Sequence, residues 1–170
     1  MIVFGIAGWS GSGKTTLIEK LIPHFTQLGK VVSVIKHAHH GFDLDRPGKD
    51  SWRHREAGAT QVLMLSEQRW VLMHELRDDP EPSLEAQLRL LAPCDVVLIE
   101  GFKAAPVPKI EVYRKANGKP PLWPESPNVV AVASDVDVHC PLPRFGLDDA
   151  AAMVDFILSY DRGTVESPGP

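Results

Sequence analysis

A phosphate-binding loop at residues 8–15, close to the start of the chain, reads Gly-Trp-Ser-Gly-Ser-Gly-Lys-Thr. It fits the pattern G-x-x-x-x-G-K-[ST], follows an apolar run at 2–7 and precedes a helical pattern, which is the context the motif requires. Backbone N–H groups of such a loop attract phosphate oxygens, Lys14 reaches the β- and γ-phosphates, and the Thr15 hydroxyl can ligate Mg²⁺. The motif therefore predicts a nucleoside triphosphate site built on a strand, a loop and a helix. The residues assigned to the phosphates are Gly8, Trp9, Ser10, Gly11, Ser12, Gly13, Lys14, Thr15 and Thr16.

The length and composition fit a single domain over residues 1–160, with 161–170 expected to be a disordered tail. The chain has 170 residues, two cysteines and a formal net charge of −4. This charge argues against general adhesion to nucleic acid or to an anionic membrane, so neither is expected as a partner. The cysteines lack the spacing of a disulfide framework or a metal site, and no apolar stretch reaches membrane-spanning length. A cytoplasmic protein is expected.

Alternating strands and helices predict an α/β fold. Strand-like runs occur at 2–7, 31–36, 60–66, 69–75, 95–100, 109–114 and 128–133, and helical patterns follow the phosphate loop and occur at 51–58, 83–92 and 148–159. Continuous apolar runs such as 96–99 are typical of parallel strands that helices cover on both faces. The adjacent runs 60–66 and 69–75 predict an antiparallel hairpin. We therefore expect a P-loop NTPase three-layer fold, with a mainly parallel sheet and a hairpin insertion.

Prolines interrupt two regions of this pattern. Pro23 lies inside the first helical pattern, where it removes a hydrogen bond and crowds the preceding turn, so a kink or an early end is expected there. Residues 115–127 contain four prolines and predict an irregular loop.

The buried run at 96–99 has a carboxylate at each end, Asp95 and Glu100. Five residues of extended chain separate the two by roughly 16 Å, so only one can lie near the phosphates. Ligands gather at the carboxyl ends of parallel strands, which selects Glu100 as the acid on the metal side, acting through a bound water. A carboxylate that only caps the following loop is the alternative.

Residues 36–51 follow the second strand and are unusually rich in ionisable side chains. One interpretation is a switch-like loop in which Asp43 or Asp45, of which we select Asp45, completes the Mg²⁺ shell. In this interpretation Lys36, Arg46 or Lys49 faces the phosphates. We assign Lys36, His37 and Lys49 to the nucleotide site. Two alternatives are a zinc site built from the histidines and a solvated polar loop. The histidines in question are His37, His39 and His40.

Ser134 and Asp135 follow the buried run at 128–133. Guanine presents two adjacent donors, N1–H and N2–H₂, to which one carboxylate can accept in a bidentate manner, and adenine cannot offer that pattern. Asp135 is therefore a candidate for reading guanine, which would favour GTP over ATP. Ordinary turn chemistry after a strand is the alternative.

Taken together, these segments resemble the MobB family of molybdopterin-guanine dinucleotide biosynthesis. The likeness rests on residues 8–16, 36–40, 45–51, 55–59, 68–70, 100–103 and 131–135. The resemblance implies a GTP-binding, weakly GTP-hydrolysing homodimer that assists the MobA guanylyltransferase in attaching GMP to the molybdenum cofactor. It also favours a guanine-reading role for Asp135. The proline-rich loop and the last residues match the family least.

The resemblance suggests a use for the basic residues of segment 101–119. Molybdopterin carries a phosphate and a partly anionic dithiolene, so Lys103, Lys109 and Arg114 are candidates for a wall that faces this anion. A solvated basic surface is the alternative.

Three functions follow from these assignments. The first is an accessory Mg²⁺-dependent GTPase, in which Lys14 stabilises phosphate charge, Thr15 and Glu100 position Mg²⁺, and Asp135 selects guanine. Hydrolysis is expected to be slow, because the sequence offers no evident arginine finger or glutamine to orient water. The second is a non-catalytic adaptor or carrier of molybdopterin whose conformation GTP sets. The third is a P-loop kinase of small molecules.

Overall fold

The computed structural model of the chain describes residues 1–38, 41–102 and 105–160. The chain divides into two compact units, one containing Met1–His39 and Leu91–Pro170 and the other containing His40–Leu90. The predicted tail at 161–170 lies outside the described residues. Among the described residues, no helix combines the length and the apolar character needed to cross a membrane.

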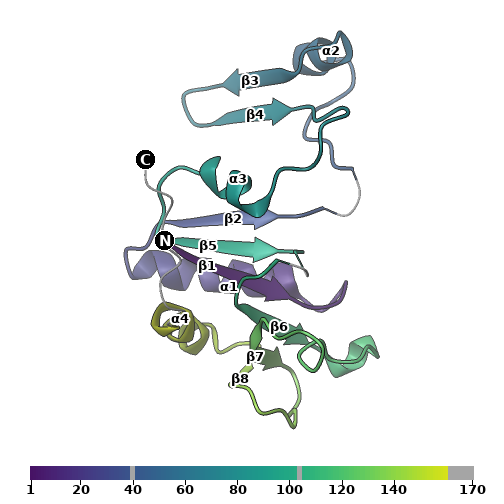
Figure 1. Cartoon of the computed structure of the whole chain (residues 1–170). Coiled ribbons are helices and arrows are strands. Elements are labelled where there is room, and N and C mark those ends of the chain that lie inside the picture. Colours follow the sequence, from purple (N-terminus) through teal and green to yellow (C-terminus); the bar gives the residue numbers. More distant parts are fainter. Residues whose placement is uncertain (39–40, 103–104, 161–170) are drawn as a thin grey trace. The chain divides into compact units, whose positions relative to one another are not determined.

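In the described part of the first unit, six strands form one parallel sheet in the order β2-β5-β1-β6-β7-β8 (Figure 1). The strands are β1 (Ile2–Ala7), β2 (Val32–Lys36), β5 (Val96–Glu100), β6 (Lys109–Tyr113), β7 (Val129–Ser134) and β8 (Arg144–Gly146). This confirms the predicted α/β fold and the strand runs other than β8. Strand β8 was not predicted, because its three residues between prolines and a polar turn are too few to show a pattern.

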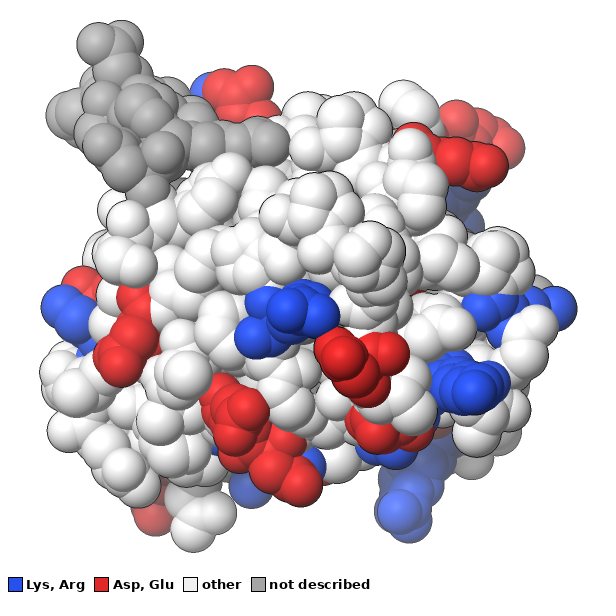
Figure 2. Space-filling view, turned by 90° about the horizontal axis from the view of Figure 1, so that it is seen from below, with Lys and Arg blue, Asp and Glu red and all other residues white. Residues whose placement is uncertain are grey.

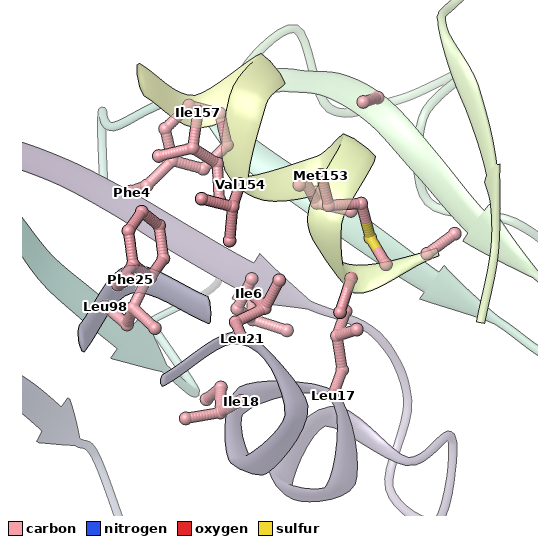
Figure 3. Packing of buried hydrophobic residues seen from close by; sticks show 14 of the residues in the cluster. Phe4, Ile6, Leu17, Ile18, Leu21, Phe25, Leu98, Met153, Val154 and Ile157 are labelled. Carbon is pink, nitrogen blue, oxygen red and sulfur yellow. The ribbon is translucent and has the colours of Figure 1, made fainter. Parts of the chain in front are cut away.

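Two helices pack against one face of this sheet, α1 (Lys14–Gln27) and α4 (Ala150–Ser159). Their apolar side chains meet those of β1 and β5 in the core shown in Figure 3. Phe4 on β1 and Leu98 on β5 face Leu21 of α1 and Ile157 of α4, and all four are fully buried. The core therefore fixes α1, and with it the loop that precedes α1, against the centre of the sheet.

Helix α1 does not end early at Pro23 but continues to Gln27. Leu21 and Phe25, on either side of the proline, are fully buried. Burial of two such side chains contributes about 1.5–3 kcal/mol each, which offsets the roughly 3 kcal/mol that a proline costs inside a helix. Tertiary packing thus overrides the local penalty.

The loop over residues 115–127 is irregular, as predicted, apart from a single 3₁₀ turn, η1 (Lys115–Asn117). It is tied to the sheet by Glu111 of β6, whose side chain is fully buried. The Glu111 carboxyl accepts hydrogen bonds from the backbone N–H groups of Leu122, at 2.8 and 3.0 Å, and Trp123, at 3.0 Å. Glu111 therefore anchors the proline-rich loop.

This anchor predicts a pH-dependent effect of Glu111→Gln. Burial raises the pKa of Glu111 above its ordinary value of about 4.5, and the N–H groups of Leu122 and Trp123 offset part of that rise. The folded protein keeps the carboxyl protonated at pH values where the unfolded chain has already ionised it. The wild type therefore loses stability as the pH rises from about 4.5 through the raised pKa.

Glutamine has no proton to lose in this window. As the pH rises, the free energy of unfolding of Glu111→Gln should therefore increase relative to that of the wild type, and the difference should level off above the raised pKa. Urea denaturation at a series of pH values measures this difference. Glu125→Gln, at an exposed position in the same loop, is the control. A difference for Glu111→Gln that stays constant with pH would contradict the prediction.

The second unit contains the predicted hairpin, formed by β3 (Gln61–Leu65) and β4 (Trp70–His74), together with α2 (Asp50–Glu56) and α3 (Leu84–Arg89). The antiparallel register pairs Leu65 with Trp70 and Leu63 with Leu72. These four side chains share one face of the hairpin, and they are 43% to 72% exposed. One face of the hairpin is thus apolar and exposed.

Candidate nucleotide-binding site

The phosphate loop joins β1 to α1 with a backbone that glycine permits. Gly8 has a φ of 142° and Gly13 a φ of 98°. A Cβ atom on Gly8 would lie 2.6 Å from Ser12 Oγ and 2.7 Å from the carbonyl oxygen of Val112, so no larger residue fits. Gly13 occupies the N-cap of α1, and the N–H groups of the next residues open the helix towards the loop. This arrangement of N–H groups suits phosphate oxygens.

The Lys14 ammonium lies along the loop backbone. Its Nζ donates to the carbonyl oxygens of Gly8, at 3.0 Å, and Trp9, at 2.9 Å. The charge is therefore held at the loop by its own main chain.

Thr15 and Glu100 meet at the carboxyl end of β5. The Thr15 Oγ1 donates to Glu100 Oε1 at 3.0 Å, and Lys36 Nζ lies 3.6 Å from Glu100 Oε2. Glu100 pairs in register with Ile6 of β1 and with Lys36 of β2, so the strand order brings the three chain ends together. The Glu100 side chain is only 12% exposed. A hydroxyl, a carboxylate and an ammonium thus share one position beside the phosphate loop.

These residues fit a Mg²⁺-bound triphosphate. Ser12 Oγ is buried and has no hydrogen-bond partner among the described residues, and it lies inside the loop where a phosphate oxygen would accept from it. Mg²⁺ is commonly held by one or two protein oxygens, with phosphate oxygens and waters completing its shell. Thr15 Oγ1 and a carboxylate at Glu100 match that requirement, although the triphosphate itself would have to supply further ligands.

Asp135, the predicted guanine reader, follows β7 and already has donors around its carboxylate. Lys115 N donates to Asp135 Oδ1 at 3.4 Å, and Arg114 Nη1 lies 3.6 Å from Asp135 Oδ2. The Ser134 hydroxyl accepts from the backbone N–H of Val136 at 3.2 Å, which starts the turn. The carboxylate is about one third exposed, so two donors orient it while part of it faces solvent.

A pocket of about 600 Å³ opens beside Asp135. It lies between the end of β7, the following turn and β8, and its volume is in the range typical of small-molecule sites. The residues that line it include Ser134, Asp135, Val136, Asp137, Leu142 and Phe145. Space for a planar base therefore adjoins the predicted base reader.

The proline-rich loop contacts the phosphate loop directly. Trp9 Nε1 donates to the carbonyl oxygen of Pro120 at 2.8 Å, and Asn117 Nδ2 lies 3.5 Å from the carbonyl oxygen of Ser10. Lys119 Nζ stands over the Trp9 ring at 5.9 Å from its centroid. Two exposed lysines, Lys115 and Lys119, therefore belong to a segment that is fastened to the phosphate loop.

The structure does not form the predicted basic wall from its described members. Lys109 is only 3% exposed, and its Nζ donates to the carbonyl oxygen of Ala105. Its position in the middle of the sheet turns its side chain onto Gly5 of the neighbouring strand rather than to solvent. Arg114 lies against the phosphate loop instead, and Lys103 lies outside the described residues.

In the second unit, Asp45 is part of a network around Arg55. The Asp45 carboxylate accepts from Ser51 Oγ at 2.7 Å, from the Arg46 N–H at 3.0 Å and from Arg55 Nε at 3.3 Å. Burial acts to raise the pKa of Asp45, but the hydrogen bonds from Ser51, Arg46 and Arg55 lower it below its ordinary value. Arg55 also pairs with Asp43 at 3.1 Å and Glu75 at 3.0 Å. The network holds segment 43–55 in a defined shape, with both Asp45 oxygens engaged.

The remaining predicted residues of the histidine-rich segment have other contacts. The His37 ring packs against the Phe102 ring in a tilted arrangement with centroids 4.5 Å apart, and Lys49 occupies the N-cap of α2. His39 and His40 lie outside the described residues. Among the residues that the structure describes, no three His, Cys, Asp or Glu side chains are grouped to hold a metal ion.

One face of the molecule carries charges of both signs. On the face shown in Figure 2, acidic and basic side chains of the described residues lie interspersed, in keeping with a net charge of −4.

Sequence reasoning missed the contact of Arg114 with the phosphate loop. Arg114 Nε donates to the carbonyl oxygen of Ser12 at 2.9 Å. The available signal was the position of Arg114 directly after a predicted strand, because the carboxyl ends of parallel strands meet at one edge.

The fold and the loop together define a protein of the P-loop NTPase type, with a phosphate-binding loop after the first strand of a parallel sheet.

Comparisons with known proteins identify the family. The model of the family MobB, molybdopterin guanine dinucleotide synthesis protein B, matches residues 3–135. The chain belongs to this family. A protein from Escherichia coli (strain K12), named molybdopterin-guanine dinucleotide biosynthesis adapter protein, is 39% identical over 161 residues, which cover 93% of this chain and 92% of the relative. A protein of the same name from Haemophilus influenzae is 42% identical over 159 residues, covering 93% and 88%.

Solved structures agree with this assignment. A crystal structure of molybdopterin-guanine biosynthesis protein B (mobB) is similar to this chain with a TM-score of 0.75 and 27% identity. The match covers 93% of this chain and 99% of that one. A crystal structure of Bacillus subtilis MobB is similar with a TM-score of 0.71 and 29% identity, covering 96% of this chain and 100% of that one. The likeness therefore extends over both units of the chain.

Proposed function

We propose that the protein is a GTP-binding, weakly GTP-hydrolysing adapter in molybdopterin-guanine dinucleotide biosynthesis, and that it assists the MobA guanylyltransferase. The observation that carries this proposal is the 3.0 Å contact between Thr15 Oγ1 and the buried Glu100 carboxylate beside the phosphate loop. The names of the relatives from Escherichia coli and Haemophilus influenzae support the adapter role.

On the phosphate side, the loop N–H groups, Ser12 and Lys14 bind the triphosphate oxygens. Mg²⁺, when bound, neutralises charge on the β- and γ-phosphates. Thr15 would hold the ion directly, and Glu100 would hold it through a water. Asp45 would have to exchange its hydrogen bonds with Ser51 and Arg55 before it could take part, so we base the metal site on Thr15 and Glu100.

On the base side, Asp135 accepts the N1–H and N2–H₂ donors of guanine in the adjoining pocket. Two neighbouring donors orient the carboxylate, which supports a fixed position for the base. The Asp135 carboxylate would thereby select GTP over ATP. GTP is the substrate from which GMP is transferred to molybdopterin.

Slow hydrolysis follows from where Arg114 lies. Phosphoryl transfer is fast when an arginine stabilises the charge on the transferred group. The Arg114 guanidinium instead bonds to the carbonyl oxygen of Ser12 and faces Asp135. Hydrolysis is therefore slow, and GTP stays bound for a long time before it is cleaved. This suits an adapter that presents a nucleotide-dependent shape to its partner.

The molybdopterin anion faces the exposed lysines beside the phosphate loop. Lys115 and Lys119 lie in the segment that Trp9 and Asn117 fasten to the loop. This position replaces the buried Lys109 as the cationic contact, and it would hold the pterin phosphate close to the bound GTP.

The experiment is a reconstitution of MobA-dependent dinucleotide formation at limiting GTP, with and without the protein. We expect the wild-type protein to stimulate formation. Glu100→Gln should reduce hydrolysis of GTP by about 100-fold, because the metal-side charge is lost. Glu19→Gln, at an exposed position on α1, is the control and should hydrolyse GTP like wild type.

Two results separate the versions of this proposal. If Glu100→Gln, or wild type loaded with a non-hydrolysable GTP analogue, still stimulates fully, then GTP binding alone serves the adapter. If both fail, then hydrolysis drives the transfer. No stimulation by wild-type protein with either nucleotide would overturn the accessory role.

A further inference from the structure

Arg114 stands where the strand order brings the phosphate side and the base side of the site together. Strand β6 lies between β1 and β7, with Ala7 beside Glu111 and Tyr113 beside Ser134 in register. The phosphate loop begins directly after β1, and Asp135 directly follows β7. Arg114, the first residue after β6, therefore lies between these two chain ends.

One guanidinium contacts both sides. Arg114 Nε donates to the carbonyl oxygen of Ser12 at 2.9 Å, and Nη1 lies 3.6 Å from Asp135 Oδ2. The guanidinium also packs on the loop backbone, since a Cβ atom on Gly13 would lie 3.4 Å from both Nε and Nη2. The Arg114 side chain is 36% exposed, so most of it is enclosed by the loop and its neighbours.

We propose that Arg114 is a positioning residue that couples recognition of the nucleobase at Asp135 to the conformation of the phosphate loop. This inference rests on the proposed GTP site. A carboxylate has about four acceptor positions, so Asp135 can keep its contacts with Arg114 and Lys115 N while it accepts from guanine. A base that holds Asp135 in place also holds the guanidinium, and the guanidinium holds Ser12.

Coupling of this kind acts in both directions. If the base stabilises the loop arrangement that binds phosphate, then bound phosphate strengthens recognition of the base by the same factor. An arginine suits this task because its planar fork presents several donors at fixed angles, whereas a lysine is a single flexible point charge. Charge alone at this position is therefore insufficient.

The test compares GTP with inosine triphosphate, which lacks the N2 amino group of guanine. Dissociation constants for both nucleotides are measured by calorimetry with wild type, Arg114→Lys and Arg114→Gln in the full chain. Wild type should prefer GTP. Both variants should reduce the preference for GTP over inosine triphosphate by about tenfold, because the charged donor that orients Asp135 is lost or displaced.

Asp135→Asn provides the second arm. In that background Arg114→Lys should cause no further loss of preference, because the two residues act as one unit. Arg89→Lys is the control, since Arg89 lies on α3 in the second unit and, among the described residues, forms its ion pair with Glu85 at 2.6 Å. Circular dichroism of each variant establishes that it is folded, and Arg114→Lys preserves the charge should Arg114→Gln fail to fold.

The outcomes distinguish the inference from the proposed function. If Arg114→Lys weakens GTP and inosine triphosphate by the same factor, then Arg114 only supports the loop and the coupling is overturned while GTP binding stands. If wild type binds neither nucleotide, the proposed GTP site fails and the coupling fails with it.

Discussion

Lys14→Ala is expected to weaken binding of Mg²⁺-GTP by about 100-fold or more, because the substitution removes a charge-assisted donor from the phosphates in a partly buried loop. The Lys14 Nζ is already fixed at 2.9 to 3.0 Å from two loop carbonyl oxygens, so little order has to be imposed when phosphate binds. Titration calorimetry with GTP in the presence of Mg²⁺ measures the loss.

Lys30→Ala is the matched control. Lys30 lies beyond the far end of α1, which has 14 residues and is therefore about 20 Å long. Because Lys14 begins this helix, Lys30 is about that far from Lys14, and GTP binding should be unchanged. GTP affinity within threefold of wild type in Lys14→Ala would mean that the nucleotide lies elsewhere, and it would remove the basis of the proposed function.

Local patterns in the sequence mark the two segments that meet beside the phosphate loop. A strand, a glycine-rich loop and a helix are adjacent in the chain, and the continuous apolar run of β5 ends at Glu100. The rule that ligands gather at the carboxyl ends of parallel strands then predicts that Glu100 and the phosphate loop lie at the same edge of the sheet. The observed contact of 3.0 Å follows from β1 and β5 being neighbours.

The residues around this centre depend on the strand order, which no local pattern contains. Arg114 reaches Ser12 only because β6 lies directly beside β1. The same insertion buries Lys109 against Gly5, so a basic residue that composition suggested for the surface lies inside the sheet. The number of charged residues in a segment does not show which of them lies at the phosphate loop, as Arg114 does, and which is buried in the sheet, as Lys109 is.

Asp45 illustrates a second limit. Its spacing from the second strand suits a metal ligand, but its partner Arg55 lies ten residues away and its neighbour Glu75 twenty residues beyond that. An acid in a loop that follows a strand serves equally to orient a structural arginine. Only the three-dimensional contacts distinguish a carboxylate engaged in such a network from one open to Mg²⁺.

Leu65→Lys is expected to convert the homodimer that the family resemblance implies into a monomer. The apolar face of the hairpin exposes 72% of Leu65 and 65% of Trp70, which pair across the two strands. Burial of such a side chain in an interface contributes about 1.5–3 kcal/mol, and two-fold symmetry counts each substitution twice. A loss of about 3–6 kcal/mol raises the dimer dissociation constant by roughly 10² to 10⁴-fold.

Sedimentation equilibrium over a range of protein concentrations measures this shift. Leu90→Lys is the control, because Leu90 is also 72% exposed but lies after α3, outside the hairpin. The face would not be the dimer contact if Leu65→Lys dimerised like wild type, or if Leu90→Lys dissociated the dimer equally. The hairpin belongs to the second unit of the chain and the phosphate loop to the first. If each subunit of the dimer binds GTP without its partner, Leu65→Lys should leave GTP affinity unchanged. A joint loss of dimer and GTP affinity would instead mean that the second subunit completes the nucleotide site.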